Sequence, residues 1–136
     1  MSADAIGLVV VGAHLTGQPL NHELTSRGGR LVGPVTTSPD YALYLLATDP
    51  PKPGLVRVEA GGAPIAAELW ELPPVGLATF LAGLPSPMAL GKVRLADGSL
   101  RIGFLVEPIA VVGARDISGY GGWRNFLAAG AAAESG

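Results

Sequence analysis

Glycine and proline interrupt this chain so often that long stretches of regular structure do not fit into it. The 136 residues include 20 glycines and 12 prolines, and both residue types break helices and strands through their backbone geometry. Hydrophobic residues still make up 49% of the chain, which favours a folded core over disorder. We therefore expect many short elements in an α+β fold, with one domain over residues 1–130. Residues 131–136 are expected to form a disordered tail.

The apolar runs between these breaks predict the individual elements. The β-branched run 6–11 is typical of a central strand that is buried on both faces. Asp97-Gly98 between two alternating runs predicts a hairpin. The three prolines of segment 49–54 cannot donate ladder hydrogen bonds, so this segment is expected to be an irregular loop. Further strands are expected at 30–35, 41–47, 55–59, 65–72, 91–95 and 100–106, and short helices at 19–27, 74–84 and 123–129.

Charge and cysteine content exclude several classes of protein. The net charge is −2, and the nine Lys and Arg residues are scattered along the chain, so a nucleic-acid partner is not expected. No apolar run approaches the roughly 20 residues that a bilayer crossing needs, and no positively charged start precedes the first apolar segment. We therefore expect no membrane partner. The chain has no cysteine, which rules out disulfides and thiolate chemistry and fits a cytoplasmic location.

The only two histidines follow the first expected strand within nine residues of each other. Gly12 ends that strand and allows close backbone approach, so the N–H groups that follow can form a small anion-binding nest. His14 would stand at the mouth of this nest, where an imidazole can give or take a proton. The alternative is that His14 only hydrogen-bonds a neighbouring carbonyl or carboxylate. His22 lies inside the expected helix 19–27, where a structural or surface role is favoured.

Four further polar residues are candidates for a site. Lys52 stands on a proline-stiffened backbone, which lowers the entropic cost of holding a cation against an anion; the alternative is a solvated lysine. Glu68 would share a strand face with Trp70, as an inward-facing acid or as a solvent-facing side chain. Tyr120 and Arg124 flank a glycine-rich turn and could form the wall of a small polar pocket.

Metal and nucleotide sites find no support in the sequence. His14 and His22 are eight residues apart, unlike the close helical spacing of a zinc pair, and no cysteine can complete such a site. The loop 12–17 lacks the glycine pattern and the lysine of a nucleotide-binding loop. We expect neither a metal nor a cofactor.

Several motifs together resemble one known family. In order, they are Gly12-Ala-His-Leu with Pro19-Leu-Asn-His22, then Ser38-Pro-Asp-Tyr-Ala-Leu-Tyr44, Pro50-Pro-Lys-Pro-Gly-Leu-Val56, Glu68-Leu-Trp-Glu-Leu-Pro73 and Ala114-Arg-Asp-Ile-Ser-Gly-Tyr-Gly-Gly-Trp-Arg124. Across about residues 6–127, the chain is similar to the C-terminal domain of allophanate hydrolase, as a freestanding module without the amidase domain. That domain is related to the gamma-glutamyl cyclotransferase-like superfamily, so the resemblance implies a small mixed β-barrel with a few short helices.

The resemblance also implies an activity and a site. It suggests a cofactor-free enzyme of urea degradation that decarboxylates N-carboxycarbamate or a related compound, with His14 as the catalytic proton donor. The candidate substrate-binding residues are Gly12, Ala13, Leu15, Asn21, Lys52, Glu68, Tyr120 and Arg124. A separately encoded amidase is an implied partner, and a homodimer is left open.

Two alternatives remain beside this activity. The first is a noncatalytic module that binds a small carboxylate or docks onto an amidase. The second is cyclotransferase-like acyl chemistry, which is weaker because segment 84–88 has no carboxylate where that superfamily carries its acid. Gly12-Ala13-His14 also replaces the Tyr-Gly-Ser-type loop of that superfamily.

Overall fold

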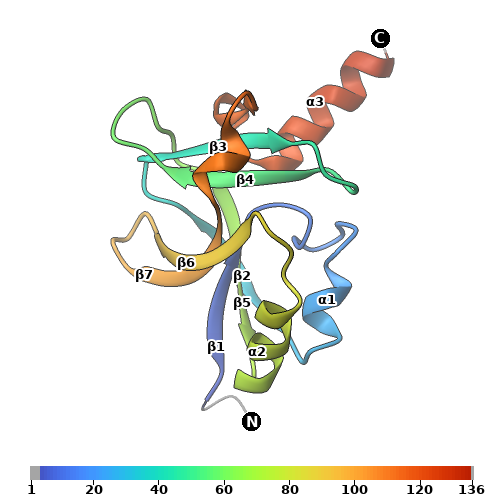
Figure 1. Cartoon of the computed structure of the whole chain (residues 1–136), viewed down its shortest axis with the longest axis vertical. Helices are drawn as coiled ribbons and strands as arrows, with labels where there is room; N and C mark the ends of the chain where they lie inside the picture. Colours follow the sequence, from blue (N-terminus) through green and yellow to red (C-terminus); the bar gives the residue numbers. More distant parts are fainter. Residues whose placement is uncertain (1–3, 136) are drawn as a thin grey trace.

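The computed structural model describes residues 4–135, with side chains as far as Ala131. Within these residues, two β-sheets form the centre and short helices lie around them (Figure 1). One sheet has the strand order β2-β5-β1-β7-β6 and the other the order β4-β3-β8. The α+β class is therefore as expected. The two sheets are open, so the expected closed barrel is not confirmed.

Strand β1 (Ile6–Val10) is the central strand of the larger sheet, as its apolar sequence predicts. It pairs antiparallel with β5 (Ala66–Leu72) and parallel with β7 (Leu100–Val106). Val9 lies opposite Gly103, where an added Cβ atom would lie only 3.1 Å from the Cβ atom of Val9 and 2.7 Å from a methyl carbon of Val93. The backbones of β1 and β7 therefore approach closely just before the chain leaves the sheet at Gly12.

The outer strands complete both sheets. Strand β2 (Arg30–Thr36) pairs with β5, and β6 (Met88–Arg94) pairs with β7 in the predicted hairpin. Gly98 in the turn of this hairpin has a φ of +86°, a conformation that favours glycine. Strand β3 (Tyr41–Leu46) is the middle strand of the small sheet, between β4 and the two-residue strand β8 (Arg115–Asp116).

The proline-rich segment does not form the expected irregular loop throughout. Strand β4 (Lys52–Arg57) begins inside it, three residues before the strand that the sequence predicts. Strand β4 pairs with β3 only and lies at the edge of its sheet. Prolines are tolerated at such an edge because one side of the strand needs no ladder hydrogen bonds. Lys52 is therefore held at the start of a strand, and Pro53 is paired opposite Leu45.

Three α-helices are present among the described residues. Helix α1 (His22–Thr25) is much shorter than the expected helix 19–27, because residues 15–21 form successive turns. Helix α2 (Pro74–Ala82) buries Leu77 and Phe80 against the core. Helix α3 (Trp123–Ser135) projects from the body of the molecule (Figure 1). It continues beyond the expected end at 129 and includes residues 131–135 of the expected disordered tail. The last residue of that tail, Gly136, lies outside the described residues. Two 3-10 helices (Pro108–Val111 and Ser118–Tyr120) lie on either side of β8.

No helix within residues 4–135 combines the length and the apolar character that a membrane crossing requires.

Candidate functional site

The chain forms a compact loop between β1 and α1. The backbone N–H of Leu15 donates to the Gly12 carbonyl at 2.9 Å, and that of Leu20 donates to the Ala13 carbonyl at 2.8 Å. The side-chain amide of Asn21 donates to the His14 carbonyl at 2.8 Å. These bonds turn the chain back on itself, so that α1 lies beside the residue that the loop presents, His14.

The imidazole of His14 is enclosed by aromatic rings. It is 5% exposed, stacks on Phe104 of β7 at 4.9 Å between ring centroids, and contacts the ring of Phe80 of α2 edge-on at 5.2 Å. Its Nε2 atom lies 2.7 Å from Oε1 of Glu23, in helix α1. The ring is thus positioned by three separate elements.

Two opposing effects act on the pKa of His14. Burial among the aromatic rings lowers it below the usual 6.5, because a low-dielectric environment disfavours the imidazolium. The hydrogen bond and the negative charge of Glu23 raise it, and the nearby charge of Lys52 lowers it. The net result is a pKa below the ordinary value, so the free site favours a neutral imidazole at neutral pH.

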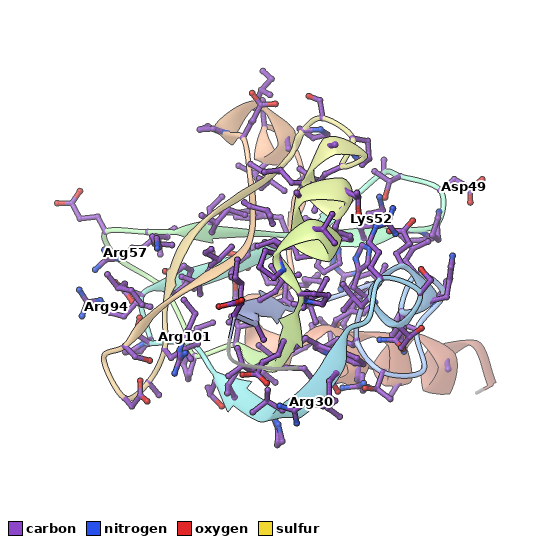
Figure 2. The ribbon with its side chains drawn as sticks, turned by 90° about the horizontal axis from the view of Figure 1, so that it is seen from below. Arg30, Asp49, Lys52, Arg57, Arg94 and Arg101 are labelled. Carbon is purple, nitrogen blue, oxygen red and sulfur yellow. The ribbon has the colours of Figure 1, made fainter. Side chains whose placement is uncertain are left out.

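His14 borders a cavity of about 280 Å³ that also contains charged side chains. Lys52, Arg27, Glu23 and Asp49 line it, together with Gly83, Leu84 and Pro85, which carry no carboxylate. Within the described part of the chain, no carboxylate is close enough to form an ion pair with Lys52. Figure 2 shows Lys52 and Asp49 on one side of the molecule and Arg57, Arg94 and Arg101 on the other. The cavity therefore offers a free ammonium group beside a protonatable ring.

Gly12 and Ala13 line a second, much smaller hollow of about 10 Å³ next to His14 and Lys52. Gly12 lies directly against strand β4. A Cβ atom on Gly12 would lie 2.2 Å from Cδ of Pro53, so only glycine fits between the loop and this proline. The close contact holds the loop beside the start of β4, which carries Lys52.

Glu68 and Arg124 lie on the other side of the loop. Oε1 of Glu68 accepts hydrogen bonds from the Thr16 N–H at 2.8 Å and from the Trp70 indole at 3.2 Å, and Oε2 lies 3.1 Å from Arg124. Burial raises the pKa of Glu68, but these hydrogen bonds together lower it below its ordinary value. Arg124 also donates to the Thr16 carbonyl at 2.6 Å. The two residues border a separate hollow of about 290 Å³ and anchor the loop through the backbone of Thr16.

The predicted site residues thus fall into separate groups. The structure brings His14 and Lys52 together at the cavity, with Gly12 and Ala13 at the adjoining hollow and Asn21 bonded to the His14 backbone. Leu15 is 2% exposed and belongs to the hydrophobic core. The Tyr120 hydroxyl accepts a hydrogen bond from Arg115 at 3.0 Å, and its ring contacts Phe126 of α3. Leu15, Glu68, Tyr120 and Arg124 do not line the cavity of His14.

Three charged residues of the cavity, Glu23, Arg27 and Asp49, were not singled out from the sequence. Glu23 and Arg27 are four residues apart, a spacing that places both on one side of the expected helix, and this was the available signal. Arg27 donates to the backbone carbonyl of Glu23 at 3.0 Å and lies over the ring of Phe80 at 5.9 Å. Among the described residues, no three His, Cys, Asp or Glu side chains converge as a metal ion would require.

Comparison with known proteins places the chain among relatives. The family model of the allophanate hydrolase C-terminal domain matches residues 6–128. The urea amidolyase of Lachancea kluyveri is 36% identical over 129 residues, which cover 91% of this chain and 7% of the amidolyase. The chain therefore spans less than a tenth of the length of this relative.

Solved structures show the same similarity. The allophanate hydrolase of Kluyveromyces lactis superimposes with a TM-score of 0.87 at 34% identity, over 90% of this chain and 21% of that one. The uropathogenic E. coli-specific protein c4763 gives a TM-score of 0.84 at 34% identity, over 91% of this chain and 96% of that one. A protein of about this size thus occurs among the relatives. An aig2-like protein from Mus musculus, at 16% identity and a TM-score of 0.60, shares the fold alone.

Proposed function

Because the chain belongs to the allophanate hydrolase C-terminal domain family, we infer that it acts in allophanate and urea degradation and decarboxylates N-carboxycarbamate or a closely related compound. One observation carries this proposal. A buried imidazole, His14, borders a cavity that also contains Lys52 and Arg27. A small dianion with two carboxylates would match these two cations, and its nitrogen would lie near the ring.

The reaction needs a proton at one atom. When the bond between nitrogen and one carboxylate breaks, the electron pair stays on nitrogen and carbon dioxide leaves. A proton from the His14 imidazolium then forms the new N–H bond, and the product is carbamate. A positioned proton donor typically accelerates such a step by about 10²–10⁴-fold. The imidazole takes up another proton from water before the next turnover.

The lowered pKa of His14 is compatible with this role. The cavity alone favours the neutral ring, but a bound dianion adds negative charge beside it and favours the imidazolium. Substrate binding would therefore be coupled to the uptake of a proton from water by the His14 ring. Lys52 would hold one carboxylate through a charge-assisted hydrogen bond, and Arg27 would hold the other with its remaining donors.

The test is the release of carbon dioxide from N-carboxycarbamate generated in place by an allophanate-hydrolysing amidase. We expect His14→Asn to lower the rate above the spontaneous background by about 10²–10⁴-fold. Lys52→Met should raise KM by about 10–100-fold, as expected for the loss of a hydrogen bond to a charged group. Lys92→Met, which changes the other lysine of the chain, is the matched control. Full activity in His14→Asn would contradict the proposal.

A noncatalytic role is the second candidate. Its support is that a relative carries this module as a small part of a much longer chain. The chain matches only 21% of the Kluyveromyces lactis allophanate hydrolase, so in that protein this module accompanies a larger part. A module that binds a small carboxylate, or docks onto a separately encoded amidase, would show malonate binding by calorimetry but no effect on carbon dioxide release. A cytoplasmic location and a homodimer remain predictions beside either role.

A further inference from the structure

The hydrogen bond between His14 and Glu23 distinguishes the two nitrogen atoms of the imidazole. Nε2 lies 2.7 Å from Oε1 of Glu23. A carboxylate oxygen accepts hydrogen bonds and does not donate them, so the hydrogen of this bond belongs to Nε2. Among the described residues, no hydrogen bond involves Nδ1 of His14, which leaves this atom for a ligand.

The surrounding rings hold the imidazole in the orientation that points Nε2, and not Cε1, at Glu23. Phe104 stacks on one face of the imidazole with an interplanar angle of 22°, and Phe80 meets it edge-on at 85°. The side chain of His14 is 6% exposed. A ring flip would have to displace these aromatic contacts, so the assignment of Nε2 to Glu23 is fixed by packing as well as by the hydrogen bond.

Glu23 is itself held in place. It lies in the first turn of α1, and Arg27 donates to its backbone carbonyl at 3.0 Å. Asn21, the residue directly before α1, donates a side-chain hydrogen bond to the His14 carbonyl and so ties the start of this helix to the loop. The carboxylate therefore reaches the ring from a helix backbone that is bonded to the same loop as His14.

We propose that Glu23 is a positioning residue that holds His14 as the Nε2-protonated tautomer, so that Nδ1 is the atom that exchanges a proton with the substrate. The second half of this proposal rests on the proposed function, and the first half does not. After the imidazolium gives its Nδ1 proton to the substrate nitrogen, the neutral ring keeps its proton on Nε2, where it is hydrogen-bonded to Glu23. This is the tautomer that the hydrogen bond favours, so no proton has to move within the ring.

The charged groups around the ring define what the experiment must separate. Glu23 stabilises the imidazolium, whereas Lys52 and His22 disfavour it. Arg27 and Asp49 also border the cavity. Removing the negative charge of Glu23 while preserving its shape should therefore lower the midpoint of the His14 titration.

The test is nitrogen-15 NMR of the two imidazoles in the uniformly labelled full chain, with His22→Gln to assign the signals of the only other histidine. Above the titration range, we expect His14 to show a protonated Nε2 and an unprotonated Nδ1, with a downfield Nε2 proton that exchanges slowly with water. Glu23→Gln should shift this proton upfield and lower the titration midpoint of His14. Glu23→Asp, which keeps the charge on a shorter side chain, should restore the midpoint in part. Glu71→Gln is the control, because Glu71 pairs with Arg30 on strand β2.

A wild-type ring protonated at Nδ1 would overturn the proposal. So would a Glu23→Gln variant whose proton shift and midpoint equal those of the wild type. A malonate titration then tests the second half, because a bound dicarboxylate should move the Nδ1 resonance and leave that of Nε2 nearly unchanged. Absence of both malonate binding and turnover, together with an Nε2-protonated ring that depends on Glu23, would refute the proposed function and leave the positioning role intact.

Discussion

At the residue scale, Gly12 sets the distance between the loop and strand β4. We predict that Gly12→Ala lowers the free energy of unfolding by about 1–3 kcal/mol, the usual range for overpacking a tight contact. The added Cβ atom would lie 2.2 Å and 2.4 Å from two ring carbons of Pro53, and a proline ring cannot rotate away. Urea denaturation measures this change.

Gly33→Ala is the matched control for this substitution. A Cβ atom on Gly33 would have no neighbour within 4 Å, so we expect a change of less than about 0.5 kcal/mol, as for most surface positions. Equal stability of the two alanine variants would show that the contact between Gly12 and Pro53 is not tight.

The residues of the site could be predicted from the sequence only in part. His14 and Lys52 could be singled out, because an imidazole after a strand and a lysine among prolines are unusual locally. The contact between His14 and Glu23 could not, since it depends on how the turns of residues 15–21 direct α1. The sequence left open whether Glu68 faces inward or toward solvent, and the structure buries it. Glu68 contacts the loop at Thr16 and does not line the cavity of His14, because β5 pairs with β1 in a register that places Glu68 opposite Val10.

At the element scale, Glu68 connects β5, the loop and the start of α3. We predict that Glu68→Ala lowers the free energy of unfolding by about 1–3 kcal/mol, because the N–H of Thr16 and the indole of Trp70 lose their acceptor in a buried place. Glu68→Gln should cost less, since its amide oxygen still accepts a hydrogen bond. Thermal or chemical denaturation of both variants provides the measurement.

Glu71→Ala on the same strand is the comparison for Glu68→Ala. Its partner Arg30 has a side chain that is 64% exposed, and such surface pairs contribute about 0–1 kcal/mol. If Glu71→Ala destabilised the protein as much as Glu68→Ala, the anchoring role of Glu68 would be wrong.

Elements with strong local signals were predicted well, and those set by neighbours were not. The hairpin of β6 and β7 follows from Asp97-Gly98 between alternating runs, and the structure confirms it. The start of β4 at Lys52 depends on its place at the edge of a sheet, which local sequence does not reveal. Likewise, α1 is short because the loop before it takes up residues that a helix pattern would also allow.

At the scale of the whole molecule, the buried imidazole predicts how stability depends on pH. The pKa of His14 in the folded protein lies below 6.5, its ordinary value. Between these two values the unfolded chain binds more protons, so the free energy of unfolding falls as pH falls through 6.5 toward the folded pKa. We predict that His14→Gln removes this fall, whereas His22→Gln keeps it.

Denaturation midpoints measured from pH 7.5 down to about 5 give the slope for each variant. A second loss is expected at more acidic pH, because the Ser38 hydroxyl and Arg57 lower the pKa of Asp40 from 3.8 to about 2. That contribution is present above 3.8 and is lost as pH falls toward 2. An unchanged slope in His14→Gln above pH 5 would mean that burial does not depress the pKa of His14.

Gly103 shows how a position that does not line the cavity can still affect His14, which borders it. It has no side chain, and the Phe104 that follows it carries the ring on which His14 rests. The spacing of β1 and β7 in the sheet interior therefore affects the position of the Phe104 ring and of the imidazole that stacks on it. A methyl group at this position would press on Val93 and Val9 inside the sheet, and the displacement would reach His14 through the stacked ring of Phe104.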